Sequence, residues 1–424
     1  MTPAYLEKSM EPHMGKLKHG FLLIVTGILS SIGSAHAQTP SADEMWEIIQ
    51  EQQATITALQ AQVGETNQKV EAAGEMLDAV SSDAGDSRLH WGGYGEVHYN
   101  AGDTQEIDVH RFVLFTEYEF NDKLRLLSEF ELEHALAGDG KPGEVELEQA
   151  FIEWDVTAGR NLFAGVHLVP VGLLNDTHEP PTFFGVERDR IHSQIIPTTW
   201  WEAGLGSSGE VGEGVGYDFF VHSGLQTPVT GSSAYAIRSG RQKVAEAVAT
   251  DPAVTGRIRW NGMPGVNLSA ALQYQNDITQ GTNNEDVAGS QLDIAAWLYN
   301  VNADVLINGW GLRAMYALWD LDSGTAGTGP ASFGKQEQWG YLIEPSYRFS
   351  VPGANGKGTF GVFARHSKFD STAGDNTDSE EQSFTVGANY WIHPAVVLKM
   401  DYDQVSLQEG TGSDRLNVGL GWQF

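Results

Sequence analysis

The sequence contains no cysteine, which excludes disulfides and thiolate chemistry. It is also poor in basic residues: 25 Lys and Arg stand against 56 Asp and Glu, giving a formal net charge of −31. A chain this acidic lacks the basic footprint that nucleic-acid binding requires, so no nucleic-acid partner is expected. Beyond residue 37, no stretch approaches the ~18 apolar residues of a membrane-spanning helix. Any insertion into a membrane would therefore use strands.

Residues 1–37 have the three parts of a secretory signal peptide. Two lysines precede the apolar run Phe21–Ile32, and Ala35-His36-Ala37 is the small-x-small pattern that signal peptidase cuts. The alternative is a membrane anchor, but about twelve apolar residues are too few to span a bilayer. We predict that the mature chain begins near Gln38.

Residues 45–80, which follow a short N-terminal segment at 38–44, carry a heptad pattern. The a positions are β-branched residues or Leu: Ile49, Ile56, Val63, Val70 and Leu77. Such a seam predicts a short α-helical coiled coil that self-associates. The alternative is one amphipathic helix packed on the rest of the protein. Residues 81–88 are rich in Ser, Asp and Gly, so we expect them to break the helix and act as a linker.

From residue 89 to residue 424, apolar and polar residues alternate with the period of two that is typical of β-strands. About sixteen such segments follow one another; every second connection is tight and the others are mostly longer and polar. This layout predicts an all-β fold, a transmembrane antiparallel β-barrel of about sixteen strands, over residues 89–424. A soluble two-sheet sandwich would also alternate, but it would not need a polar face on nearly every strand together with aromatics on the apolar face.

The last strand should pair with Leu89–Tyr99 and close the barrel. Its Leu416, Val418, Leu420, Trp422 and Phe424 share one face. Trp422 and Phe424 are expected to serve as the recognition signal for the barrel assembly machinery, a feature of outer-membrane barrels as a class. The expected location is the bacterial outer membrane, among lipid and lipopolysaccharide, with the coiled coil in the periplasm.

Charged residues on the polar face are expected to line the lumen. The acids are Glu117, Glu129, Glu131, Glu133, Glu153, Asp155 and Asp401, and the bases are Arg111, Arg125, Arg257, Arg259, Arg313, Arg348, Arg365 and Arg415. Acids crowd the second to fourth strands and bases predominate from the eighth strand onward. Opposed charged walls would set a transverse field that filters ions. Alternatively, many of these residues pair across neighbouring strands and keep the wall hydrated.

The connection over residues 170–198 is far longer than most loops, which indicates function or disorder. Its apolar residues, among them Phe183 and Phe184, argue against disorder and need a surface to pack on. We expect the loop to fold into the barrel, narrow the pore and present charged residues to solutes: Asp176, Glu179, Glu187, Arg188, Asp189 and Arg190. The alternative is a loop that covers the extracellular mouth.

Catalytic and metal-binding patterns are not found. The histidines are scattered without a metal-ligand spacing, and no twelve-residue calcium loop is present. Gly204-Leu205-Gly206 lacks the strand-turn-helix setting of a nucleophile elbow. We therefore predict no catalytic residue, no metal and no cofactor.

The order of several segments resembles the porin O/P family. These are the strands Val145–Asp155 and Asn161–Val169, then the loop with P-V-G-L and F-G-V-E-R, and then Trp201–Gly206. The resemblance implies a trimeric, sixteen-stranded outer-membrane porin whose third loop enters the lumen. The family is named for phosphate-selective channels, and that selectivity depends on a dense ladder of inward Arg and Lys. The ladder is not visible here, so the phosphate site is not carried over.

These features predict a passive diffusion channel for small hydrophilic solutes or ions, weakly selective, with an acidic lumen. Two other classes stay open: a structural or adhesive barrel with a coiled-coil stalk, and a barrel enzyme. The enzyme would need a Ser/His or carboxylate pair at the rim within hydrogen-bond reach.

Overall fold

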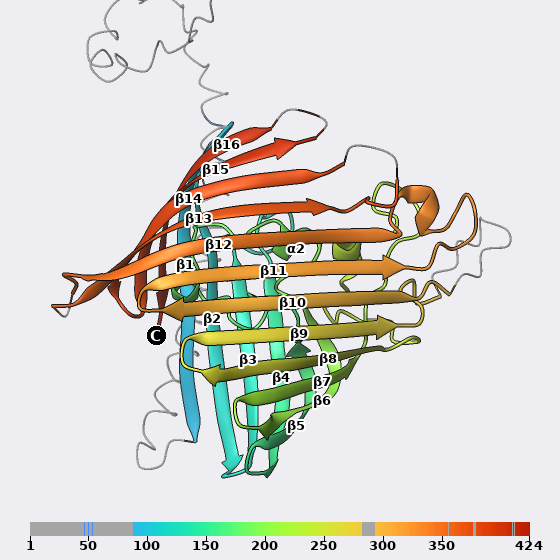
Figure 1. Cartoon of the computed structure of the whole chain (residues 1–424), viewed down its shortest axis with the longest axis horizontal. Helices are drawn as coiled ribbons and strands as arrows, with labels where there is room; N and C mark the ends of the chain where they lie inside the picture. Colours follow the sequence, from blue (N-terminus) through green and yellow to red (C-terminus); the bar gives the residue numbers. More distant parts are fainter. Residues whose placement is uncertain are drawn as a thin grey trace, which may run out of the picture. The chain divides into compact units, whose positions relative to one another are not determined.

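The computed structural model describes residues 88–281, 293–354, 356–375, 379–408, 410 and 412–424, together with Trp46, Gln50 and Gln53. Within these residues, sixteen antiparallel strands form one closed barrel (Figure 1), as the alternation predicted. The expected signal peptide lies outside the described residues, as do the coiled coil, apart from three of its positions, and the linker, apart from Arg88. Those interpretations stay predictions.

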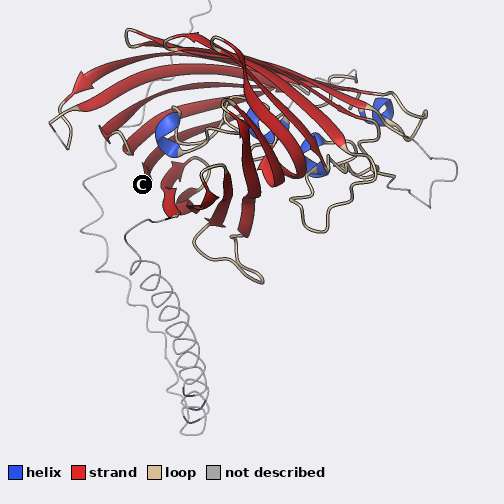
Figure 2. Cartoon of the chain, turned by 90° about the horizontal axis from the view of Figure 1, so that it is seen from below, coloured by secondary structure: helices blue, strands red, loops and turns tan. Residues whose placement is uncertain are grey.

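The strands follow the chain in order around the barrel. They are β1 (Leu89–Ala101), β2 (Gln105–Asn121), β3 (Leu124–Glu133), β4 (Val145–Thr157), β5 (Arg160–Leu168), β6 (Trp201–Gly212), β7 (Val215–His222), β8 (Ala253–Met263), β9 (Val266–Gln275), β10 (Ala296–Ile307), β11 (Trp310–Leu321), β12 (Glu337–Val351), β13 (Gly358–Asp370), β14 (Glu381–His393), β15 (Val396–Leu407) and β16 (Ser413–Gln423). Short helices η1 (Pro180–Thr182), α2 (Ile191–Gln194), η2 (Ile237–Gly240) and η3 (Pro330–Phe333) lie in the connections (Figure 2). None of these described helices has the length and apolar character needed to cross a membrane.

The barrel closes where β1 meets β16. Their register runs from Tyr94 opposite Gln423 to Ala101 opposite Leu416. The prediction that the last strand pairs with the first is confirmed. Because every buried or lipid-facing backbone group needs a partner, this closure removes the free edges that an open sheet would leave.

The two ends of the barrel differ in their connections. At one end, the turn end, the connections are two residues long except at 352–357; at the other, the loop end, they reach more than thirty residues at 169–200. Gly265 shows how the turns are made: its φ is +79°, and a Cβ there would lie 2.1 Å from the Leu306 carbonyl oxygen. Only glycine fits such a position.

Outward and inward side chains follow the predicted alternation. On β16, Leu416, Val418 and Leu420 are exposed on the outer face, whereas Asn417 between them is buried inside. Trp310 on the outer face of β11 is 70% exposed, as expected for an aromatic residue that meets lipid or its interface.

Part of the inner face is apolar, and here the sequence-based prediction is wrong. Phe163, Phe220, Leu298 and Trp319 point inward from β5, β7, β10 and β11 and form a buried cluster with residues of the connection 169–200. The expectation that a polar face lines nearly every strand fails on this side. The physical reason is that a loop folded into the barrel buries apolar side chains, which require apolar partners on the wall.

Candidate functional site

The connection between β5 and β6, residues 169–200, lies inside the barrel; we call it loop L3. Its two ends are held together at the wall, because the Val169 amide donates to the Trp200 carbonyl at 3.0 Å. The buried Asn175 side chain donates to the carbonyls of Val169 and Trp200 at 2.7 and 2.9 Å, and its own oxygen accepts the Trp200 amide at 2.7 Å. One asparagine therefore fixes the base of the loop.

The apolar half of loop L3, residues 191–200, packs on the apolar part of the wall. Ile191, Ile195 and Trp200 are fully buried in the same cluster as Trp319 of β11. The Trp319 indole also donates to the Ile195 carbonyl at 2.9 Å. This half combines hydrophobic burial with directed hydrogen bonds, which Arg241 also donates to the Pro197 and Thr199 carbonyls, so it anchors the loop.

The polar half, residues 176–190, is held mainly through its backbone. Four successive carbonyls each accept one side-chain donor from the wall, at 2.6 to 3.0 Å: Pro181 from Trp391, Thr182 from Arg313, Phe183 from Asn389 and Phe184 from Arg365. The Val186 amide donates to Asp401 at 2.6 Å. Because buried backbone groups must be hydrogen-bonded, these wall residues from β11, β13, β14 and β15 determine the path of the loop.

The two phenylalanines of this half lie under cations. Phe183 and Phe184 are about 1% exposed. The Lys399 ammonium lies 3.5 Å from the ring centre of Phe183, and the Arg348 guanidinium lies 4.8 Å from that of Phe184. Both rings pack against the wall, where a cation above an aromatic face is stabilised.

Charged side chains of loop L3 pair with the wall. Asp176 contacts Arg257 at 2.7 Å and Arg190 contacts Glu381 at 2.7 Å. Of the remaining predicted residues, Arg188 donates to Thr199 at 3.1 Å, Asp189 accepts the Ile191 amide at 2.9 Å, and Glu179 is half-buried. Most of the predicted loop residues therefore make contacts that position the loop.

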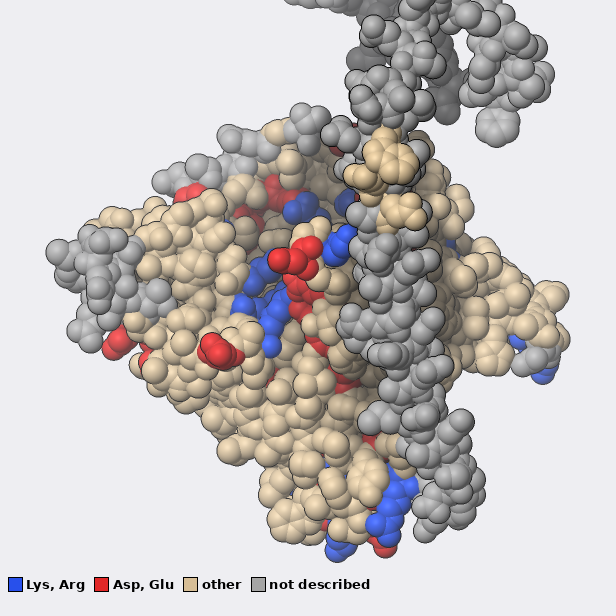
Figure 3. All heavy atoms as spheres, turned by 180° about the vertical axis from the view of Figure 1, so that it is seen from behind, with Lys and Arg blue, Asp and Glu red and all other residues tan. Residues whose placement is uncertain are grey.

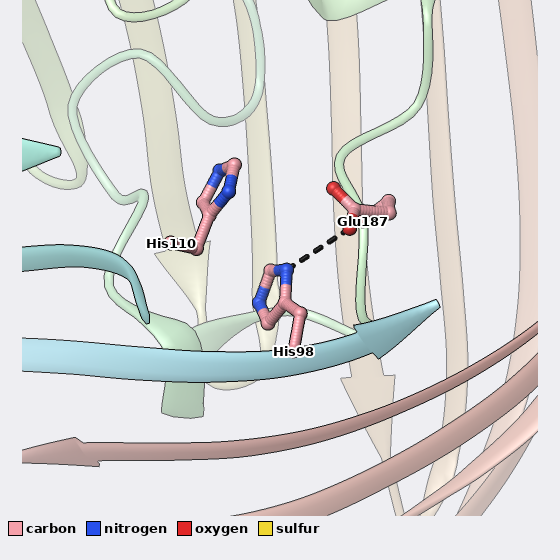
Figure 4. A group of neighbouring side chains, drawn as sticks. All are labelled: His98, His110 and Glu187. Atoms are coloured by element: carbon pink, nitrogen blue, oxygen red, sulfur yellow. Dashed lines mark hydrogen bonds and ion pairs between the residues drawn. The ribbon is translucent and has the colours of Figure 1, made fainter. Parts of the chain in front are cut away.

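Glu187 links loop L3 to β1 (Figure 4). Its carboxylate lies 2.9 Å from His98 Nδ1 and accepts a hydrogen bond from Asn100 at 2.9 Å. His110 of β2 stacks on His98 with ring centres 4.6 Å apart. Burial opposes ionisation of Glu187, but the contact with His98 outweighs it and lowers the pKa of Glu187 to about 2. Glu187 therefore stays ionised at neutral pH.

The two histidines of loop L3, His178 and His192, have pKa values shifted in opposite directions. Burial, with the nearby Arg365 and Arg313, lowers the pKa of His192 to about 3, so this ring is neutral. Burial also opposes protonation of His178, but the adjacent Glu129 carboxylate outweighs it and raises the pKa of His178. The space around His178 is therefore strongly negative.

All the predicted lumen residues lie on strands whose register turns them inward, but they fall into two groups. Six are buried: Arg111, Glu129, Glu131, Arg257, Arg365 and Asp401. The other nine are partly exposed: Glu117, Glu133, Glu153, Asp155, Arg125, Arg259, Arg313, Arg348 and Arg415. The prediction that the six line water is wrong, because they are buried, and all of them except Glu131 contact loop L3.

The exposed inner charges are mixed in sign. Figure 3 shows a hollow in which basic and acidic side chains lie side by side. A cavity of about 240 Å³ beneath Phe184 includes Asp304, Arg313, Glu344 and Arg348 in its lining. A smaller space between loop L3 and strands β13–β16 is bordered by Arg188, Arg190, Arg365 and Arg415 together with acids. Such surfaces can replace part of the hydration of small polar solutes.

Several residues that hold loop L3 in place were not identified from the sequence. Asn175, Asn389 and Trp391 bear no charge and were not singled out. Trp391 did carry a signal, since a large aromatic residue on an otherwise polar strand face indicates contact with something inside. Among the described residues, four sets of His and acidic side chains also place ligand atoms within 4.8 Å of one another. The residues of each set do not follow a recognisable metal-ligand spacing in the sequence, so the sets were not predicted.

Comparison with known protein families gives one match that covers most of the chain. The family model of phosphate-selective porins O and P matches residues 85–416. The chain belongs to this family. A porin of this family is an outer-membrane channel.

This porin is also similar to individual proteins. A protein of Aquifex aeolicus (strain VF5), described as uncharacterised, is 29% identical over 354 residues, which are 78% of this chain and 79% of that protein. Among solved structures, the porin is similar to OmpF of Salmonella typhi in complex with daunomycin, with a TM-score of 0.54, 14% identity and coverage of 79% and 97% of the two chains. It is also similar to the anion-selective porin from Comamonas acidovorans, with a TM-score of 0.52, 13% identity and coverage of 79% and 99%. At these identities the likeness shows the fold alone.

Proposed function

We propose that this porin is a passive diffusion channel for small hydrophilic solutes or ions, weakly selective, with an excess of acidic groups along the path. The observation that carries the proposal is the pairing of exposed inner arginines. Arg125, Arg259, Arg313 and Arg415 lie 3.1, 2.9, 3.0 and 3.6 Å from a carboxylate of the wall. Paired charges attract a passing ion of either sign only weakly.

Acids whose partners lie at the limit of ion-pair distance favour cations. Glu117 and Glu119 of β2 point inward near the turn end, lie 3.9 Å from Arg125 and 3.8 Å from His90, and are 37% and 50% exposed. Transfer of phosphate needs donors and positive charge that are free to bind it. Because the arginines named above already contact carboxylates, we do not propose phosphate as the preferred solute.

The assembly we propose is a homotrimer in the outer membrane, with the coiled coil in the periplasm. A trimeric form is recorded for OmpT of Vibrio cholerae, which shares the fold. Native mass spectrometry of the detergent-solubilised protein tests this part. A trimer mass supports it, and a monomer at all concentrations contradicts it.

A planar lipid bilayer with a KCl gradient tests the channel itself. We expect stepwise conductance and a reversal potential of the sign that indicates modest cation preference. Glu117→Gln combined with Glu119→Gln should reduce that preference, whereas Asp320→Asn, on the outer face of β11, should leave it unchanged. Absence of conductance steps would contradict a channel and favour a structural or adhesive barrel; a clear anion preference would contradict the acidic path.

A further inference from the structure

A group of buried carboxylates faces loop L3 from the wall formed by β3 and β4. Glu129 and Glu131 come from β3, Glu146 and Glu148 from β4, and His178 reaches them from the loop. Glu129, Glu131, Glu148 and His178 are each no more than 3% exposed. Ionised groups at this depth require a compensating charge, because taking an unpaired charge out of water is strongly unfavourable.

The neighbouring cations are already engaged. Arg111 donates to Glu96 through Nε at 2.6 Å. Lys243 contacts Glu146 and also lies 2.5 Å from Glu144. Arg241 donates to the Pro197 and Thr199 carbonyls. Within the part of the chain that the structure describes, Glu129, Glu131 and Glu148 have no ion pair with Lys or Arg, so the group has a deficit of positive charge.

Three buried atoms in the group have no hydrogen-bond partner: Glu131 Oε1, Glu148 Oε2 and His178 Nε2. His178 Nε2 lies 3.5 Å from Glu129 Oε1 and 3.8 Å from Glu148 Oε2. Those distances are too long for good hydrogen bonds. They approach the spacing of about 3.3 Å between ligand atoms that a tetrahedral ion with bonds of about 2.0 Å imposes.

The ligand atoms are oriented by a second layer of contacts. His178 Nδ1 lies 3.0 Å from the Asn175 carbonyl, which can only accept a hydrogen bond, so Nδ1 carries a proton and Nε2, which must be deprotonated to bind a metal ion, faces the carboxylates. Gln149 donates to Glu129 Oε2 at 2.5 Å, and Oε1, which the Tyr94 hydroxyl approaches at 3.4 Å, is turned toward His178. Histidine ligands of metals characteristically donate their other ring N–H to a carbonyl in this manner.

We propose that Glu129, Glu148 and His178 bind one divalent first-row transition metal ion, which fastens loop L3 to the wall formed by β3 and β4. Imidazole together with carboxylate oxygen suits Zn²⁺ and Mn²⁺. Glu131 and Glu146, whose oxygens lie within 4.8 Å of Glu148, stand beside the site. The ion supplies the positive charge that this buried group otherwise lacks.

The test uses the full chain carrying His110→Gln. His110 belongs to two other histidine sets, His98–His110–Glu187 and Asp108–His110–His134, so this substitution removes one ligand from each competing set. Zn²⁺ binding is measured by equilibrium dialysis with elemental analysis. We expect one Zn²⁺ per chain, and addition of His178→Gln should weaken binding more than ~100-fold, beyond what loss of an outer-layer partner costs.

His192→Gln in the same background is the matched control. His192 is also a buried histidine of loop L3 with both ring nitrogens unpartnered, but Arg365 and Arg313 are the charges that act on it. Its substitution should leave Zn²⁺ affinity unchanged. Glu148→Gln serves as a second variant if His178→Gln does not fold, and folding is checked by the heat-dependent mobility of the barrel on a gel.

X-ray absorption at the zinc edge on the His110→Gln protein needs no ligand variant, and one nitrogen with two or more oxygen ligands is the expected shell. A folded His110→Gln protein that binds no Zn²⁺ would overturn the proposal and leave protons as the compensating charge. Equal binding with and without His178 would overturn it as well, since the ion would then lie elsewhere. Neither result bears on conductance, so the channel proposal is judged separately.

Discussion

The apolar half of loop L3 buries Ile191, Ile195 and Trp200 against the inner face of the barrel, whereas the polar half gives its backbone carbonyls to side-chain donors of the wall. Hydrophobic burial is strong but without direction. Hydrogen bonds are individually weaker but define positions within tenths of an ångström. The apolar half therefore secures the loop, and the polar half sets the shape and charge of the space that solutes meet.

Trp319→Ala should have the largest effect, because it removes the main wall partner of the apolar half. Loss of a buried tryptophan typically costs about 3–5 kcal/mol, and its hydrogen bond to Ile195 is lost as well. We expect a lower midpoint of thermal unfolding and a larger, noisier single-channel conductance. Trp310→Ala on the outer face of the same strand is the control. Equal conductance changes in the two variants would contradict the assignment of the anchor.

Arg365→Met tests the polar half. Arg365 is buried, donates to the Phe184 carbonyl at 2.6 Å and pairs with Glu344 through Nε at 2.7 Å. Its loss leaves Glu344 as a buried unpaired charge, for which about 3 kcal/mol is expected. Adding Glu344→Gln should restore most of the unfolding midpoint but not the original conductance, since Phe184 still lacks its donor. A double variant as unstable as the single one would contradict this explanation.

Lowering the pH should destabilise the folded protein, because protonation of His192 is unfavourable in the apolar half of loop L3. Its pKa is held near 3, below the ordinary 6.5, so its contribution to stability is fully present above pH 6.5 and is lost as the pH falls toward 3. The expected loss is about 3 kcal/mol by pH 4. His192→Gln should flatten this part of the curve of unfolding midpoint against pH. His366→Gln, on the outer face of β13, should leave the curve unchanged; a wild-type midpoint independent of pH between 6.5 and 4 would contradict the prediction.

Arg190→Gln should have the smallest effect. Its ion pair with Glu381 is 2.7 Å long, and the Glu381 side chain is only 8% exposed, but the arginine side chain is 47% exposed, so water and the glutamine amide can still solvate the carboxylate. Pairs of this kind contribute less than about 1 kcal/mol. The expected outcome is an unchanged unfolding midpoint with a slight shift of the reversal potential toward cations. A fall in midpoint as large as that of Arg365→Met would mean that the polar half is not held mainly through its backbone.

The barrel was predictable from the sequence because its pattern is local. Leu416, Val418 and Leu420 alternate with Asn417 and Gly419 whatever the rest of the chain does, and the inward direction of Arg257 or Arg348 follows from the same period. The place of loop L3 was also expected, from its length and its apolar residues. These inferences need only neighbours along the chain.

The contacts inside the barrel were not predictable in the same way. Leu298 and Tyr299 are both apolar neighbours on β10, and only the closed structure shows that Leu298 is buried inside while Tyr299 is exposed outside. Glu129, Glu148 and His178 are separated by tens of residues, so no ligand spacing was present to find. A charged residue at an inward position is expected to face the water of the lumen. Whether it contacts water or loop L3 depends on the path of the loop, which the sequence does not give.

The bond between Val186 and Asp401 joins residues 215 positions apart. Contacts of such high contact order form late and slowly, because a long intervening chain must be ordered before they can exist. Loop L3 leaves the wall between the fifth and sixth strands, yet its polar half has no complete set of partners until β15 is in place. A barrel arrested before its last two strands would therefore still hold four carbonyls of loop L3 through β11, β13 and β14, but it would leave the Val186 amide without its acceptor.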